Sequence, residues 1–139
     1  MYSKINRKRT HKRGAFLRQA LQTVANQTWR PIEAVVVEDG SSEGEAICKE
    51  FEGIIPISYH QLNPGRGRSV AGNHALSKAT GEWFCFLDDD DVLFADHIEV
   101  LLEVARSEGV AGAYGLSWRT HTEILDKENA IYRELLMEA

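Results

Sequence analysis

The stretch WFCFLDDDD, which runs from Trp83 to Asp91, joins five apolar residues directly to four consecutive aspartates. A wholly apolar run of this length, rich in aromatic side chains, predicts a buried β-strand over Trp83–Leu87. The aspartates then follow at the carboxyl end of that strand. Because ligands of open α/β sheets bind at the carboxyl ends of the strands, this junction is the first candidate for a functional site.

Helical and strand-like patterns alternate on both sides of this stretch. Apolar residues recur at helical spacing between Ala15 and Gln27, and a short β-branched run, IEAVVV, covers Ile32–Val37. The alternation predicts the α/β class, a single domain over 1–139 with a mostly parallel sheet flanked by helices. Further helices are predicted over Glu43–Phe51, Ser69–Ala79, Asp96–Ser107 and Asp126–Met137, and further strands over Ile54–His60, at an edge because of Pro56, and over Val110–Trp118.

Length and composition restrict the classes of protein that fit. A chain of 139 residues with 43% apolar residues can bury one core, and 27% charged residues are typical of a folded domain. No run approaches the ~18 apolar residues of a membrane-spanning helix, and the first 13 residues lack the apolar stretch of a signal peptide. Cys48 and Cys85 form no disulfide framework. We therefore expect a cytoplasmic protein, with peripheral association at the inner face of the membrane left open.

The net charge of −5 hides a strongly basic beginning of the chain. No acid precedes Glu33, whereas half of the 16 Lys and Arg residues do. Such an arm can bind nucleic acid, an anionic membrane surface or phosphorylated ligands, or it can be a solvated tail. The eight residues are Lys4, Arg7, Lys8, Arg9, Lys12, Arg13, Arg18 and Arg30.

The four aspartates Asp88–Asp91 repel one another, because like charges a few ångströms apart disfavour simultaneous ionisation. Mg²⁺ or Mn²⁺ would offset this repulsion, and both ions favour one or two carboxylates together with water and phosphate oxygens. A solvated loop that caps the helix predicted from Asp96 is the alternative. The position directly after an apolar strand favours the metal site.

The segment Asn63–Asn73 (NPGRGRSVAGN) contains glycines but matches neither standard phosphate-binding motif. No Lys-Ser or Lys-Thr follows Gly72, as a P-loop requires, and the third glycine of a dinucleotide fingerprint is missing. The remaining interpretation of the segment is a basic loop beside a helix N-terminus. Arg66 and Arg68 can meet phosphate there through charge-assisted hydrogen bonds, or they can be solvated surface side chains.

Three segments in this order resemble the nucleotide-binding half of a family 2 glycosyltransferase, of the inverting GT-A class. Thr10–Trp29 (THKRGAFLRQALQTVANQTW) resembles the first loop and the helix that ends in Q-T. Pro31–Ser42 (PIEAVVVEDGSS) resembles the second strand with its D-D-G-S loop, and Asn63–Asp91 resembles the block that ends in L-D-x-D-D. The resemblance covers about Thr10 to Gly115 and implies a GT-A fold.

The resemblance also implies roles for individual residues. Asp88 and Asp90 would form the D-x-D motif that holds Mg²⁺ or Mn²⁺ against the diphosphate of a nucleotide sugar, with Asp90 as a direct ligand. Further residues implied at the nucleotide-sugar site are Thr10, Arg13, Glu38, Asp39, Arg66, Arg68, Asn73 and Asp89. Asp39 would contact the base or ribose, Glu38 conservatively replaces the first acid of D-D-G-S, and Arg66 or Arg68 would replace the arginine of the family's A-R-N triplet. Asp89 and Asp91 would support the site.

Two departures from the family pattern affect the expected activity. Tyr2–Arg9 (YSKINRKR) holds the place of the family's first, central strand but has one aliphatic residue, so we expect a basic arm over 1–9 instead. Only 48 residues follow Asp91, so the acceptor-binding half, which supplies the general base, is expected to be largely absent.

The resulting hypothesis is a transferase that moves a sugar from a nucleotide-diphosphate sugar to a hydroxyl of a saccharide or lipid, with metal assistance. A truncated, non-catalytic relative that binds nucleotide and metal is the alternative. A nucleic-acid-binding protein with a basic arm is a third class, but the aspartates would serve no purpose in it, so we expect no nucleic-acid partner. No catalytic residue is assigned.

Overall fold

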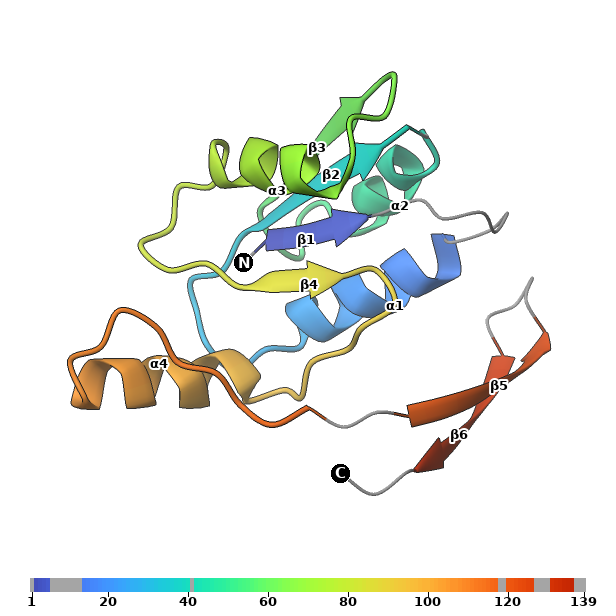
Figure 1. Ribbon diagram of the computed structural model, residues 1–139. Helices are drawn as coiled ribbons and strands as arrows, with labels where there is room; N and C mark the ends of the chain where they lie inside the picture. The colour runs from blue at the N-terminus through green and yellow to red at the C-terminus, as the bar shows by residue number, and fades with distance from the viewer. Residues whose placement is uncertain (1, 6–13, 41, 118–119, 127–130, 137–139) are drawn as a thin grey trace.

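The computed structural model of the chain describes residues 2–5, 14–40, 42–117, 120–126 and 131–136. A four-stranded sheet in the order β3-β2-β1-β4 forms its centre, and all its neighbouring strands run parallel (Figure 1). The strands are β1 (Tyr2–Ile5), β2 (Ala34–Asp39), β3 (Ile57–Leu62) and β4 (Phe86–Asp88). The predicted α/β class with a mostly parallel sheet is confirmed.

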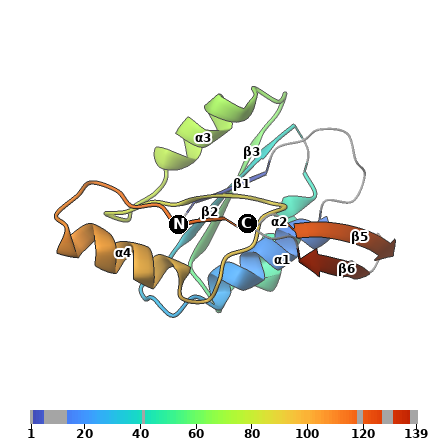
Figure 2. The same ribbon diagram turned by 60° about the horizontal axis from the view of Figure 1, so that its bottom comes forward.

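Helices cover both faces of this sheet. They are α1 (Gly14–Ala25), α2 (Gly44–Glu50), α3 (Arg68–Leu76) and α4 (His97–Ser107). Figure 2 shows α3 on one side of the sheet and α1 on the other. The alternation of side chains along β2 explains this layering, since Val36 packs in the cluster that contains Leu17 and Leu21 of α1, whereas Val35 and Val37 pack against α3.

The first strand departs from our expectation. Tyr2–Ile5 forms β1, which pairs with β2 on one side and β4 on the other, so the prediction of a basic arm in place of the first strand is wrong for these residues. Ser3, for example, lies in register with Val36 and with Leu87. The backbone groups of β2 and β4 need a partner between them, and this pairing outweighs the weak strand pattern of the sequence. Residues 6–9 lie outside the described part.

The C-terminal segment also differs from its prediction. Val110–Trp118 was expected as a strand, but residues 110–117 have no regular structure, because Gly112 and Gly115 weaken a strand. Trp118 lies outside the described residues. The helix predicted over Asp126–Met137 is wrong as well, since β5 (Thr120–Asp126) and β6 (Ile131–Leu136) form a separate antiparallel pair. Thr120, Thr122 and Ile124 place β-branched residues at a spacing of two, which is typical of a strand.

The strands at the two edges of the sheet meet one expectation and depart from another. The edge position predicted for Ile54–His60 is confirmed, and β3 begins directly after Pro56. The prediction of a buried strand over Trp83–Leu87 is met only in part, since β4 covers Phe86–Asp88 and Leu87 alone of the predicted residues is buried. Strand β4 is short and lies at the other edge, where Phe84 and Phe86 are both more than half exposed. No helix in the described ranges is long and apolar enough to cross a membrane.

An ion pair joins α1 to α2 on the surface. Arg18 Nε and Nη2 donate to the two carboxylate oxygens of Glu50 at 2.6 Å each, and this contact lowers the pKa of Glu50. Because both side chains are about half exposed, we expect Arg18→Ala to lower the free energy of unfolding by only about 0.5 kcal/mol. A lowered carboxyl pKa means that this contribution exists at neutral pH and disappears on acidification through the glutamate range. Urea unfolding of Arg18→Ala, Glu50→Ala and the double variant checks this, and a coupling energy above about 1.5 kcal/mol would contradict it.

Candidate functional site

The carboxyl ends of β2 and β4 lie at the same edge of the sheet, as expected for parallel strands. Asp39 is the last residue of β2, and Asp88 is the last residue of β4. Strand β1 lies between β2 and β4, and the segment that leads into α3 contacts the end of β2 at Asp39. The fold therefore brings together two acidic groups that are 49 positions apart in the sequence.

Asp39 holds the loop that precedes α3. Its Oδ1 accepts a hydrogen bond from the backbone N–H of Arg66 at 2.5 Å, and its Oδ2 accepts one from the N–H of Gly67 at 2.8 Å. The loop approaches so closely that a Cβ on Gly65 would lie 3.4 Å from Asp39 Oδ1, while Gly67 has a φ of 90°. The glycines of this segment therefore allow close approach and a left-handed turn next to a carboxylate, not the cradle of a standard phosphate loop.

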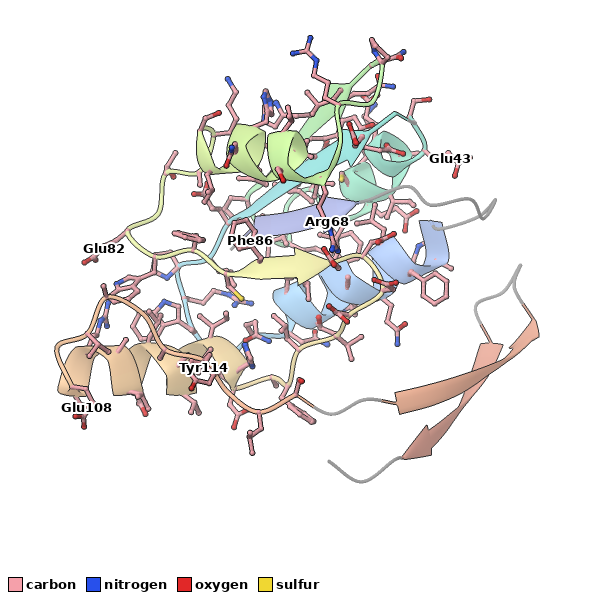
Figure 3. All side chains as sticks on the ribbon, in the orientation of Figure 1. Glu43, Arg68, Glu82, Phe86, Glu108 and Tyr114 are labelled. Carbon is pink, nitrogen blue, oxygen red and sulfur yellow. The ribbon has the colours of Figure 1, made fainter. Side chains whose placement is uncertain are left out.

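Arg68, the first residue of α3, connects this loop to the aspartates. Its Nη2 lies 2.5 Å from Asp88 Oδ2, and Figure 3 shows the side chain reaching from the start of α3 toward the end of β4. The Arg68 side chain is 61% exposed and that of Asp88 is 33% exposed. The structure thus brings together Asp39, the loop at Arg66 and Gly67, Arg68 and Asp88 in one connected set of contacts.

The four aspartates differ in exposure. Asp89 is buried and Asp88 is partly buried, whereas Asp90 and Asp91 are exposed. The pKa of Asp91 is raised, first by burial and then by the negative charges of Asp90 and Asp88, and Arg68 opposes this effect. The concentration of like charge expected from the sequence is therefore present at the end of β4.

This donor set fits a hard divalent cation. Carboxylate oxygens are the ligands that Mg²⁺ and Mn²⁺ prefer, and the mutual repulsion of the aspartates would be relieved by positive charge. Within the described ranges, no group of three or more His, Cys, Asp or Glu side chains forms a complete metal-binding set. A site that uses one or two carboxylates and fills the other positions with phosphate and water oxygens agrees with both observations.

Glu38 is buried near the end of β2 and supports the same edge. Its carboxylate accepts hydrogen bonds from the N–H of Glu43 at 3.2 Å, from the N–H of Gly44 at 2.9 Å and from Tyr59 Oη at 2.5 Å. Glu38 is only 3% exposed. Burial and the hydrogen bond to Glu38 raise the pKa of Tyr59, and burial raises the pKa of Cys48 to about 12. The carboxylate of Glu38 thus holds the N-terminus of α2, and nucleotide contact by Glu38 stays a prediction.

Gln27 is a supporting residue to which sequence reasoning assigned no role. Its Nε2 donates to Phe94 O at 2.7 Å, and its Oε1 accepts from the N–H of Ile98 at 3.1 Å. The neighbouring Thr28 N–H donates to Ala95 O at 2.8 Å. These bonds fix the segment that leads away from the aspartates to the end of α1. The sequence feature that could have indicated this role is the Q-T pair at the end of the first predicted helix, which was used only as evidence for the family resemblance.

The remaining predicted site residues fall into two groups. Arg66 and Asn73 are exposed, Arg66 in the loop and Asn73 on the second turn of α3. Thr10 and Arg13 lie outside the described residues, so their predicted positions near the base stay predictions.

The chain matches the model of a known protein family over most of its length. The model described as Glycosyl transferase family 2 matches residues 9–134. Among curated proteins, glycosyltransferase GlyA of Streptococcus pneumoniae is 36% identical over 87 residues, which are 62% of this chain and 12% of GlyA. The uncharacterized glycosyltransferase YibD of Escherichia coli is 32% identical over 95 residues, which are 66% of this chain and 27% of YibD.

A third relative and a solved structure extend the comparison. A Campylobacter jejuni protein named GalNAc(5)-diNAcBac-PP-undecaprenol beta-1,3-glucosyltransferase is 29% identical over 109 residues, or 76% of this chain and 35% of that protein. TarS of S. aureus, in a crystal structure with UDP, superposes with a TM-score of 0.67 and 22% identity over 78% of this chain and 32% of TarS. The chain thus spans well under half the length of these relatives. It belongs to glycosyl transferase family 2 and has the GT-A fold of its structural neighbours.

Proposed function

We propose that this chain forms the donor-binding part of an inverting glycosyltransferase that takes a sugar from a nucleoside diphosphate sugar. The observation that carries the proposal is the joint edge of β2 and β4, where Asp39, Arg68 and the aspartates Asp88–Asp91 come together. This edge combines carboxylates with a basic loop, which are the groups needed for a metal-bound diphosphate. Membership of the family and the UDP in the TarS structure support the same class of ligand.

Asp88 and Asp90 are the residues proposed to hold Mg²⁺ or Mn²⁺. When bound, the ion would neutralise charge that develops on the diphosphate as it leaves. Arg68 lies beside this position and can bind phosphate oxygens with its guanidinium. Asp39 and the backbone around Arg66 lie at the neighbouring strand end, where we propose that the nucleoside part is bound.

The proposed acceptor is a hydroxyl group of a saccharide or a lipid. The name of the Campylobacter jejuni relative contains a polyprenol-linked saccharide, which supports an acceptor of that class. In an inverting reaction the acceptor oxygen attacks the anomeric carbon as the bond from that carbon to the diphosphate oxygen breaks, and the hydroxyl proton passes to a base. The described residues leave that base unassigned.

Binding of nucleotide and metal without sugar transfer is the second candidate. It needs only the donor edge at the ends of β2 and β4, whereas transfer also needs the base that the described residues leave unassigned. The two candidates share the donor site and differ in turnover. Release of UDP from UDP-sugars, measured with and without saccharide acceptors, separates them.

The donor site is tested by calorimetric titration with UDP, GDP and dTDP, each in Mn²⁺ and in EDTA. We expect one of them to bind in Mn²⁺ and Asp90→Ala to weaken this binding roughly 10- to 100-fold, because a carboxylate ligand of the ion is lost. Asp96→Ala is the matched control, since Asp96 is an exposed aspartate close in sequence whose side chain makes no capping bond to α4. A folded chain that binds none of the three nucleotides would refute the proposal.

A further inference from the structure

One oxygen of a proposed metal ligand is occupied by an arginine in this structure. Arg68 Nη2 lies 2.5 Å from Asp88 Oδ2, so a full positive charge lies where the sequence predicts a cation to bind. The pair lies at the surface, since the Arg68 side chain is 61% exposed. An exposed ion pair contributes little to folding, which leaves its partners free to exchange.

The backbone of Arg68 is fixed although its side chain is exposed. The residues directly before it, Arg66 and Gly67, donate their N–H groups to the two oxygens of Asp39, and Gly67 O accepts a hydrogen bond from the N–H of Ala71 in α3. Ala71 and Ala75 are completely buried against β2, which anchors the helix. The guanidinium can therefore move between neighbouring anions without movement of the main chain.

We propose that Arg68 is an exchangeable counter-ion, which balances Asp88 in the ligand-free chain and turns to the diphosphate when the metal-bound donor arrives. This inference rests on the proposed function. A guanidinium binds phosphate oxygens through two parallel hydrogen bonds, a geometry that a phosphate offers as well as a carboxylate does. Once a divalent cation neutralises Asp88, the attraction between Arg68 and Asp88 weakens, and the diphosphate becomes the stronger partner.

The exchange predicts effects of opposite sign on the two ligands. Without Arg68, Asp88 has no competing cation, so Mn²⁺ alone should bind more tightly. The diphosphate loses its guanidinium partner at the same time, so the nucleotide should bind more weakly in the presence of Mn²⁺. A residue that only supports the loop would shift both affinities in the same direction, and a solvated surface arginine would shift neither.

The experiment measures both affinities for Arg68→Gln in the full chain. Free Mn²⁺ is measured by electron paramagnetic resonance, and UDP is titrated by calorimetry at saturating Mn²⁺. We expect Mn²⁺ alone to bind about 3- to 10-fold more tightly and UDP about 10-fold more weakly than to the wild type. Arg68→Lys keeps the charge but loses the two-pronged geometry, so it should restore the Mn²⁺ affinity of the wild type and only part of the UDP affinity.

Lys78→Gln serves as the matched charge control. It removes one positive charge from an exposed residue just beyond the C-terminal end of α3, whereas Arg68 begins this helix beside the aspartates. We expect less than about a 2-fold change in the affinity for Mn²⁺ alone. Thermal unfolding of each variant shows whether it is folded.

The outcomes separate this inference from the proposed function. Opposite shifts in Arg68→Gln, absent from Lys78→Gln, support the exchange. Shifts of the same sign, or no shift, with intact binding of UDP and Mn²⁺ by the wild type would overturn the exchange and leave the proposed function standing. Absence of binding of Mn²⁺ alone to the wild type, with intact binding of UDP in Mn²⁺, would overturn the exchange only. Absence of nucleotide binding to the folded wild type in Mn²⁺ would overturn both.

Discussion

Replacing Glu38 with leucine is expected to lower the free energy of unfolding by about 3 kcal/mol, because three donors lose their acceptor together. Two of them are the backbone N–H groups of Glu43 and Gly44 at the start of α2, and the third is Tyr59 Oη on β3. Glu43 itself supplies no capping hydrogen bond from its side chain. Glu38 thus acts as the cap of α2 from a neighbouring strand, and its loss leaves one buried donor and two partly buried donors without this partner.

Two further variants separate the components of this loss. Glu38→Gln keeps the shape and one acceptor oxygen, so we expect about 1 kcal/mol, and Tyr59→Phe removes one bond and should cost a similar amount. Urea unfolding followed by circular dichroism measures all of them. In the double-mutant cycle, Tyr59→Phe should cost nearly nothing once Glu38 is leucine. A loss below about 1 kcal/mol for Glu38→Leu would show that the carboxylate does not hold α2.

The sequence predicts the α/β alternation well because the deciding patterns are local. Helix α1 has apolar residues at helical spacing, and β2 is the β-branched run AVVV followed by Glu38 and Asp39. The failures occur where a segment depends on distant partners. Tyr2–Ile5 has a poor strand pattern but is paired between β2 and β4, and β4 is less buried than its apolar sequence suggests because it lies at an edge.

The candidate site shows the same division. The apolar run ends at Leu87 and Asp88 follows directly, so this local pattern is enough to place the aspartates at the end of a strand. The sequence alone did not distinguish Arg66 from Arg68 as the basic residue at this site. The packing of α3 on β2 decides that Arg68 lies beside Asp88. The cap that Glu38 provides for α2 could not be predicted from the sequence for the same reason. Glu38 is close in sequence to α2, but burial of its carboxylate depends on Tyr59 of β3.

Gln27 caps α4 from the end of α1, much as Glu38 caps α2. Asp96, the residue before α4, makes no capping hydrogen bond with its side chain, and Gln27 Oε1 accepts the N–H of Ile98 in the first turn instead. The amide group also donates to Phe94 O at 2.7 Å. Since Gln27 is 3% exposed, no water replaces these contacts at low cost. Its two polar atoms therefore fix both the start of α4 and the segment that follows Asp91.

We expect Gln27→Leu to lower the free energy of unfolding by about 2 kcal/mol, because a partly buried donor and a partly buried acceptor of the backbone both lose their partner. In this variant, the Ile98 amide should exchange its hydrogen faster than in the wild type, and this increase should exceed that of amides in the middle of α4. Gln27→Glu keeps the acceptor for Ile98 but sets a carboxylate against Phe94 O, so it should retain protection of that amide while still losing stability.

Thr28→Val is the control, because its hydroxyl bond to Glu99 is exposed and should contribute less than about 1 kcal/mol. If the segment also positions the aspartates, Gln27→Leu should weaken Mn²⁺-dependent binding of UDP under conditions where the variant is fully folded. Unchanged exchange at Ile98 together with full stability would contradict the role of Gln27 as a cap.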